Sequence, residues 1–196
     1  MTDLSKPVGA ALGWRRRDTR YLYQSGWYDV RQDDVTLPSG EEIVFTYVEH
    51  PGFVSVIALT EAREVVLIRS YRYTVDEWVW EVPAGGLGGK EGHSLEAVAA
   101  EELAEESGYV ADGPLRHVAA SFMSIGNSRT VAHVFLATGA RLAGPPRPES
   151  TEVIEVHPTP VAEALRMAHA GEIADAASAL ALLLCEPLLT GDGPPG

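Results

Sequence analysis

Residues 81–110 constrain the fold and chemistry of this chain more than any other stretch. The stretch begins as the end of a predicted strand and continues through a glycine-rich loop at 84–92. A helix follows. It starts after Ser94, a residue type favoured at the N-cap, and stops at Gly108, a residue type that ends helices in the left-handed conformation. The sequence therefore predicts a strand, a loop and a helix in direct succession.

Acidic residues lie on the side of this helix that should be buried. Wound at about 100° per residue, the helix carries an apolar stripe made of Leu95, Val98, Ala99 and Leu103. Glu102 and Glu106 fall within the stripe, one turn apart. Glu105 lies at its edge, and Glu101 lies further round the same side.

Carboxylates on a buried helix face need a neutralising partner, and like charges at i and i+4 repel each other. Divalent cations such as Mg²⁺ or Mn²⁺, which prefer oxygen ligands, would resolve both problems. The alternative is a solvated acidic face, which is the usual explanation of a run of charges. The apolar stripe around the acids and the glycine loop before them favour a metal site.

The second half of the stretch resembles the signature motif of the Nudix hydrolases. In that motif an arginine and a glutamate precede an apolar residue, two more glutamates, a glycine and a second apolar residue. The positions that match here are Glu102, Leu103, Glu105, Glu106, Gly108 and Tyr109. The half of the motif that holds metal ligands is therefore present.

The first half of the motif is rewritten. Counted back from the helix, its first acid falls on His93 and its arginine on Glu101. The loop after Gly85 is two residues longer than the family spacing, so Glu91 keeps its distance from that glycine but stands too far from the helix. In the family the acid and the arginine are thought to pair, and we predict that His93 and Glu101 pair with reversed polarity. The alternative is that both are solvent-exposed and the longer loop braces the helix.

Composition and charge narrow the functional classes. A chain of 196 residues can hold one domain of ordinary size, with or without a small appendage. Its net charge of −13 disfavours nucleic acid and anionic membranes as partners. No run approaches the length of a membrane-spanning helix, and the N-terminus lacks the order of a secretory signal. Cys185 is the one cysteine, so no disulfide can form within the chain, and we expect a soluble cytoplasmic protein.

The remaining elements are short strands and two further helices. We expect an N-terminal β region at 1–50 with a turn at 38–40, a main domain at 51–190 and a disordered tail at 191–196; residues 1 to about 20 show no clear pattern. The main domain should contain strands at 54–59, 65–70, 78–82, 117–122, 131–137 and 153–156, and later helices at about 160–170 and 174–184. These elements amount to a mixed α/β sandwich. The Nudix resemblance implies the αβα sandwich of that family.

Residues 27–184 are similar to the ADP-ribose pyrophosphatase branch of the Nudix family. The resemblance implies a homodimer that the N-terminal β region helps to form, and nucleoside diphosphate sugars as substrates. It also implies that Arg72 contacts the diphosphate or a partner chain, although a surface ion pair fits Arg72 nearly as well. Tyr71, Trp78 and Trp80 could stack on a base, but aromatic residues of this kind more often belong to a core or an interface.

The resemblance also supplies the ligands of Mg²⁺ or Mn²⁺. Glu102 and Glu106 are the ligands from the helix, with Glu105 as a further ligand or as the residue that holds the attacking water. The backbone carbonyl of Ala84 and the side chain of Glu152 complete the set. The family's general base falls on Ser150, which cannot serve, and Glu149 beside it stays a candidate.

Three functions are compatible with the sequence. The favoured one is a metal-dependent hydrolase that splits ADP-ribose, or a related nucleotide sugar, into two phosphates. The second is a non-catalytic nucleotide-binding module on the same fold. It is supported by the departures from the family motif at His93, Glu101 and Ser150. The third is a hydrolase of another nucleotide derivative, because a shared fold does not decide the substrate.

Overall fold

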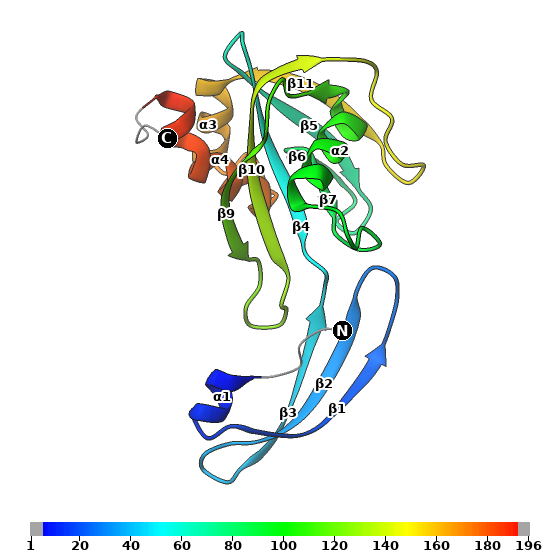
Figure 1. Ribbon diagram of the computed structural model, residues 1–196, viewed down its shortest axis with the longest axis vertical. Coiled ribbons are helices and arrows are strands. Elements are labelled where there is room, and N and C mark those ends of the chain that lie inside the picture. The colour runs from blue at the N-terminus through cyan, green and yellow to red at the C-terminus, as the bar shows by residue number, and fades with distance from the viewer. Residues whose placement is uncertain (1–5, 192–196) are drawn as a thin grey trace. The chain divides into compact units, whose positions relative to one another are not determined.

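The computed structural model describes residues 6–191 of the chain. The described residues divide into two compact units (Figure 1). Residues 6–51 and the loop 122–130 form the N-terminal unit. Residues 52–121 and 131–191 form the main unit. No helix in the described part of the chain is both long and apolar enough to span a membrane.

The N-terminal unit contains a short helix and a three-stranded antiparallel sheet. The helix α1 spans Pro7–Ala11, and the strands β1 (Arg15–Tyr23), β2 (Asp29–Thr36) and β3 (Glu42–Glu49) follow in that order across the sheet. The expected turn lies between β2 and β3, where Gly40 has a φ of 87°. The sequence did not predict α1 and β1. All residues of β1 except Thr19 are exposed, so the strand lacks the apolar alternation that would reveal it.

A buried charge network crosses this small sheet. Arg31 has no exposed surface, and its guanidinium bonds to both carboxylate oxygens of Asp33, at 2.8 and 3.1 Å, and to Glu49 at 3.0 Å. The hydroxyls of Thr19 and Tyr47 donate to the same Asp33 carboxylate. The arginine is therefore matched by two acids, as a buried cation requires.

The main unit is built on one mixed sheet. Its strand order is β11-β5-β4-β10-β8, and β6, β7 and β9 pair with β5, β4 and β10 respectively. β4 and β10 run parallel, whereas β5 is antiparallel to β4, β6 and β11. The strands are β4 (Phe53–Thr60), β5 (Glu64–Arg72), β6 (Glu77–Glu81), β7 (Ala84–Gly86), β8 (Tyr109–Val110), β9 (Arg116–Phe122), β10 (Val131–Leu142) and β11 (Ile154–Pro160).

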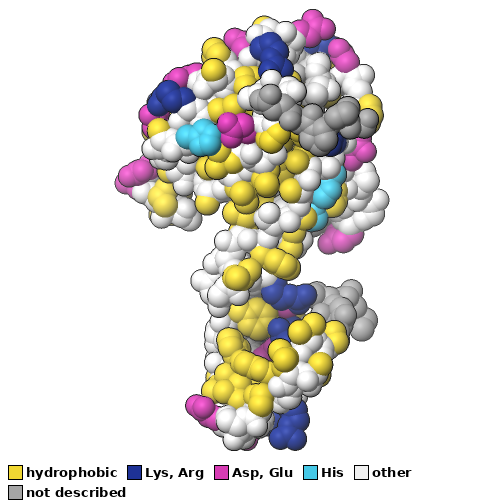
Figure 2. Space-filling view, turned by 90° about the vertical axis from the view of Figure 1, so that its left-hand side faces the viewer, with side chains coloured by type: hydrophobic (Ala, Val, Ile, Leu, Met, Phe, Trp, Pro, Cys, Tyr) yellow, Lys and Arg dark blue, Asp and Glu magenta, His cyan; other side chains and the backbone are white. Residues whose placement is uncertain are grey.

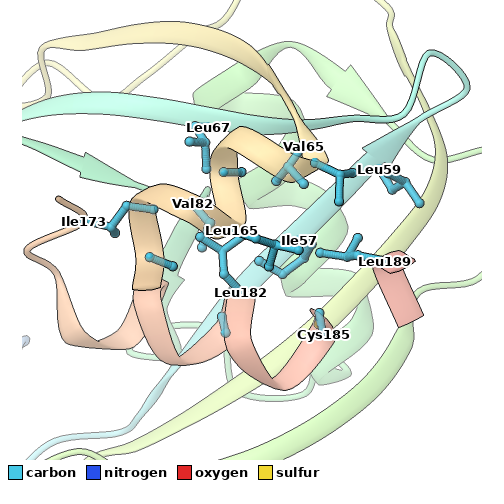
Figure 3. Packing of buried hydrophobic residues seen from close by; sticks show 14 of the residues in the cluster. Ile57, Leu59, Val65, Leu67, Val82, Leu165, Ile173, Leu182, Cys185 and Leu189 are labelled. Atoms are coloured by element: carbon cyan, nitrogen blue, oxygen red, sulfur yellow. The ribbon is translucent and has the colours of Figure 1, made fainter. Parts of the chain in front are cut away.

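Helices cover both faces of this sheet. Alternate residues of β4 belong to two separate apolar clusters, Val56 and Ala58 to the one on the side of α2 (Leu95–Ser107), Ile57 and Leu59 to the other. The second cluster includes residues of α3 (Val161–His169) and α4 (Ala176–Thr190) (Figure 3). The expected mixed α/β sandwich is confirmed.

β10, β11 and α4 run further than the sequence indicated. α4 continues past Pro187 to Thr190, because Leu189 is fully buried in the core and the Arg63 guanidinium donates to its carbonyl. β11 includes two prolines, which an edge strand tolerates because one side of its backbone needs no donor. Of the expected tail, Gly191 is the left-handed cap of α4, and 192–196 lie outside the described residues.

Candidate functional site

The helix α2 begins and ends where its caps predict. The Ser94 hydroxyl accepts a hydrogen bond of 3.1 Å from the Ala97 N–H. Gly108 has a φ of 75°, and its N–H donates to the Ala104 carbonyl. A Cβ on Gly108 would also overlap the Gly144 carbonyl oxygen, so glycine is needed there for space as well as for conformation. These local signals fix the position of every acid on the helix.

Glu106 is the most buried acid of α2, with an exposed fraction of 3%. Its carboxylate accepts a hydrogen bond of 2.7 Å from the backbone N–H of Ala84 in the glycine loop. The pKa of Glu106 is raised to about 8, first by burial and then by the charges of Glu152 and Glu102, against the opposing effects of the Ala84 N–H and Arg72. Burial thus makes the carboxylate form of Glu106 costly, and a cation close to it would offset that cost.

Glu102 is half-buried beneath the glycine loop. A Cβ on Gly85 would overlap the Glu102 carboxylate, so the missing side chain lets the acid approach the loop backbone. Burial raises the pKa of Glu102 and the nearby charges of Glu105 and Glu152 raise it further, while Lys90 lowers it. The Lys90 ammonium lies 2.6 Å from the carboxylate. A cation thus already contacts this acid.

The loop before β11 brings Glu152 towards the helix. The Glu152 carboxylate accepts a hydrogen bond of 2.8 Å from the Glu149 N–H, and the Glu152 N–H donates to the Glu149 carbonyl at 3.0 Å. The Arg147 N–H holds the loop to the C-terminal end of α2 through the Glu105 carbonyl. Because Glu152 raises the pKa of both Glu102 and Glu106, the three acids share one electrostatic site. The side chains of Glu105 and Glu149 are exposed at its edge.

Arg72 pairs with an acid that the sequence analysis did not single out. Its guanidinium makes two Nε contacts, of 2.8 and 3.0 Å, and one Nη2 contact of 2.8 Å with the buried carboxylate of Glu81. The Arg72 charge also reaches Glu106, whose pKa it lowers. Tyr71, the preceding residue of β5, donates its hydroxyl to Asp76 and lies with its ring 6.4 Å from that of Trp78.

A small pocket of about 30 Å³ opens between β5, α2 and the loop before β11. Its lining residues are Ser70, Tyr71, Arg72, Glu106, Thr151, Glu152, Val153 and Ile154. The Ser70 hydroxyl is buried and has no hydrogen-bond partner among the described residues. The pocket thus combines an unpaired hydroxyl, two carboxylates and a guanidinium, and it has room for one water-sized group.

These residues fit a hard divalent cation by the chemistry of their donors. Glu102, Glu106 and Glu152 offer carboxylate oxygens, and the Ala84 carbonyl belongs to the loop that closes over them. Among residues 6–191, no three acidic, histidine or cysteine side chains converge on a single point as they stand. Glu102 instead contacts Lys90, and Glu106 contacts a backbone N–H. Small rotations of these side chains would have to accompany ion binding.

The rewritten half of the motif makes the contact that the sequence predicts. His93 Nδ1 lies 3.6 Å from Glu101 Oε1, and both side chains are about half exposed. Lys90 lies 3.6 Å from the other oxygen of Glu101, which was not foreseen. The sequence feature that could have indicated this contact is the longer loop, because its additional residues bring Lys90 to the helix. The loop is thus attached to α2 by basic groups on the loop and acids on the helix.

Comparisons with known proteins identify the family of this chain. Residues 49–180 match the Nudix domain, and residues 14–48 match the N-terminal domain of nucleoside diphosphate sugar hydrolases. The chain is 32% identical over 155 residues to the ADP-ribose pyrophosphatase of Bacillus subtilis (strain 168), covering 79% of this chain and 82% of that protein. It is 31% identical over 172 residues to the CMP-5'-(N-acetyl-N-hydroxy-3-aminopropyl)phosphonate hydrolase of Streptomyces rubellomurinus (strain ATCC 31215), with 88% and 82% covered.

A crystal structure of an ADP compounds hydrolase has the same fold, with a TM-score of 0.78 at 18% identity, covering 92% of this chain and 96% of that one. The Nudix match spans more than half of the sequence, and both curated relatives exceed 30% identity over most of their length. The resemblance drawn from the helix motif is confirmed. The chain belongs to the Nudix hydrolase family and is homologous to its ADP-ribose pyrophosphatases.

Proposed function

We propose that this chain hydrolyses the diphosphate of ADP-ribose, or of a related nucleoside diphosphate sugar, with Mg²⁺ or Mn²⁺. ADP-ribose would give AMP and ribose 5-phosphate. The observation that carries the proposal is Glu106, a buried carboxylate that shares its site with Glu102 and Glu152. Acids gathered in this way are unstable without a cation, and a cation is what the charge of a diphosphate also needs.

The residues of the site divide the work of hydrolysis. A divalent ion bound by the carboxylates would neutralise the non-bridging oxygens of the diphosphate and lower the pKa of a bound water. Gly85 lets the loop backbone approach the acids of α2, because a Cβ there would overlap Glu102. Arg72 can turn its guanidinium from Glu81 towards a phosphate, because its side chain is 44% exposed. A planar guanidinium can donate two parallel hydrogen bonds to two oxygens of one phosphate.

One bond forms and one breaks. A water oxygen attaches to a phosphorus, the bridging P–O bond breaks, and the proton of the water passes to a carboxylate. Glu105 and Glu149 are the candidates for that base, since both are exposed at the edge of the site. Glu149 lies beside Glu152 in the loop and Glu105 lies on the rigid helix.

The deciding experiment is a panel of nucleotide derivatives incubated with Mg²⁺ or Mn²⁺, followed by chromatography and ³¹P NMR of the products. The panel should contain ADP-ribose, other nucleoside diphosphate sugars and a CMP-phosphonate, because one relative of equal similarity is a CMP-phosphonate hydrolase. We expect ADP-ribose or another diphosphate sugar to be the best substrate. Preference for the CMP-phosphonate would mean that the substrate is like that of the Streptomyces relative and not a diphosphate sugar. Turnover of none would leave the non-catalytic module as the function, whereas equal turnover by Glu106→Gln would mean that Glu106 does not hold the catalytic metal.

The homodimer and the cytoplasmic location expected from the sequence belong to the same proposal. Large apolar side chains of the N-terminal unit are exposed, among them Leu22, Tyr23, Trp27, Tyr28 and Val44. Figure 2 shows hydrophobic side chains gathered on the viewed face of this unit. A patch of this kind marks an interaction surface. Sedimentation equilibrium of the full chain should give twice the chain mass, and a monomer across micromolar concentrations would contradict the dimer.

A further inference from the structure

His117 of β9 and His133 of β10 form a pair that the proposed reaction does not use. His133 Nδ1 lies 3.4 Å from His117 Nε2, and the ring centroids are 5.5 Å apart. The His117 ring also rests 5.0 Å from the ring of Phe135, a buried residue of the same sheet face. This apolar contact holds one imidazole of the pair in place.

The pair differs from other histidines of the protein in its partners. His93, His157 and His169 each face a glutamate, as basic groups on an acidic protein commonly do. In the described chain, the polar contact of His117 and His133 is with each other. Two neutral imidazoles can share one N–H···N hydrogen bond, whereas two protonated imidazoles repel each other. Without a carboxylate beside it, the pair gains little stability from its own contact.

We propose that His117 and His133 bind a divalent transition-metal ion of the Zn²⁺, Ni²⁺ or Cu²⁺ class, with water in the remaining positions. A Zn–N bond is about 2.0–2.1 Å, so two nitrogens at a tetrahedral angle are about 3.3–3.4 Å apart. The observed separation is 3.4 Å. The pair therefore already has the spacing of two ligands on one ion.

Binding needs a change of tautomer but no net loss of protons from the neutral pair. Both facing nitrogens must present lone pairs, so His117 carries its proton on Nδ1 and His133 on Nε2. The imidazole that donated to its neighbour moves its proton to the outer nitrogen. A slight rotation of the exposed His117 ring then aims both lone pairs at the ion.

The ion chemistry separates this pair from the acids around α2. Imidazole nitrogen prefers Zn²⁺, Ni²⁺ and Cu²⁺, whereas Mg²⁺ and Mn²⁺ prefer the oxygens of carboxylates. The pair also has a distinct place in the chain. β9 and β10 are the strands through which the chain leaves the main unit after Ser121 and returns at Val131. An ion between them would clamp the base of this hairpin.

The test is a calorimetric titration of the full-length protein with Zn²⁺ in saturating Mg²⁺, which keeps the carboxylate site occupied. The parent should bind one Zn²⁺ per chain, and His117→Gln and His133→Gln should each weaken binding at least tenfold. Both histidines are surface residues, so the variants should fold. His169→Gln is the matched control, because it removes an exposed histidine of another element, and it should bind Zn²⁺ as the parent does.

Cu²⁺ provides a second measurement, since electron paramagnetic resonance counts the nitrogens bound to the ion. The parent should show two nitrogens and each His-to-Gln variant one. Amide exchange in β9 and β10 should also slow when Zn²⁺ is added to the parent, and not when it is added to the variants. Unchanged Zn²⁺ affinity in both variants, or loss of binding in Glu106→Gln instead, would overturn the proposal. Neither outcome depends on whether the chain hydrolyses nucleotides.

Discussion

Replacing Glu106 by glutamine should stabilise the metal-free protein while abolishing its activity. The glutamine keeps the shape of the side chain and a carbonyl oxygen that can accept the Ala84 N–H. It removes a charge that is 97% shielded from water, since only 3% of the residue is exposed. It also relieves the repulsion from Glu102 and Glu152. The variant is thus a permanent mimic of protonated Glu106.

The size of the gain follows from the raised pKa. The folded-state pKa of Glu106 is about 8 against an ordinary value of 4.5, a difference of about 3.5 units. At about 1.36 kcal/mol per unit, the charge costs at most about 5 kcal/mol above pH 8, and about 3 kcal/mol at pH 7. Relaxation and entry of water will reduce these figures, and we expect a gain of about 2 kcal/mol at pH 7.

The direction with pH is fixed by the same shift. An acid whose pKa is raised on folding contributes stability that is fully present below pH 4.5, and loses it as the pH rises through about 8. The parent should therefore weaken relative to Glu106→Gln across this window, while the two proteins have similar stability at pH 4. Other acids titrate in both proteins and cancel in the difference.

Urea unfolding with EDTA, at half-unit steps from pH 4 to 9, measures the difference. Glu105→Gln is the matched control, because it removes the same charge from an exposed position one residue away, and it should show no such gain. Saturating Mg²⁺ or Mn²⁺ should stabilise the parent more than Glu106→Gln. A difference between parent and variant that does not change with pH would refute the reasoning, because it would mean that the carboxylate is not destabilised in the folded protein.

Other substitutions test neighbouring parts of the structure. Glu152→Gln should chiefly raise the metal concentration required for activity, whereas Glu149→Gln should lower turnover at saturating metal. If steady-state assays show equal and negligible effects of both substitutions, the loop before β11 has no part in the mechanism. Lys90→Met should tighten Mn²⁺ binding about fivefold, because an ion pair of about 1 kcal/mol no longer competes with the metal for Glu102. Unchanged affinity in a Mn²⁺ titration would show that Lys90 does not compete with the metal. Arg31→Met should lower the free energy of unfolding by about 3 kcal/mol, because it leaves the buried Asp33 carboxylate without its guanidinium partner. The exposed control Arg20→Met should lower it far less in the same urea measurement.

The sequence predicted best those elements whose signals are local. α2 runs from Leu95 to Ser107 because Ser94 and Gly108 cap it, and each cap acts within a few residues. The acids on its buried face followed from helical spacing alone. Glu106 is buried and Glu102 half-buried, as the apolar stripe indicated. Six of the eight strands of the main unit could likewise be found from their apolar runs, whereas the very short β7 and β8 were not expected.

Contacts between distant segments were not predictable in this way. β1 has no apolar face, so only its pairing with β2 makes it a strand. The bond between Arg72 and Glu81 depends on the register of β5 and β6, which the sequence does not state. The end of α4 depends on the burial of Leu189, which outweighs the tendency of a proline to end a helix. Each of these features is decided by tertiary packing.

The changes at positions 93 and 101 give the glycine loop and the acids of α2 a shared cation, Lys90. An arginine at position 101 would remove the carboxylate that His93 and Lys90 contact there. Here Glu101 takes that place, and the loop supplies both His93 and Lys90 to meet it. Because Lys90 reaches Glu101 at 3.6 Å and Glu102 at 2.6 Å, the same side chain both braces the loop and neutralises an acid of the proposed metal site. We expect an ion that binds Glu102 to release Lys90 towards Glu101 or a phosphate, which would couple metal affinity to the position of the loop.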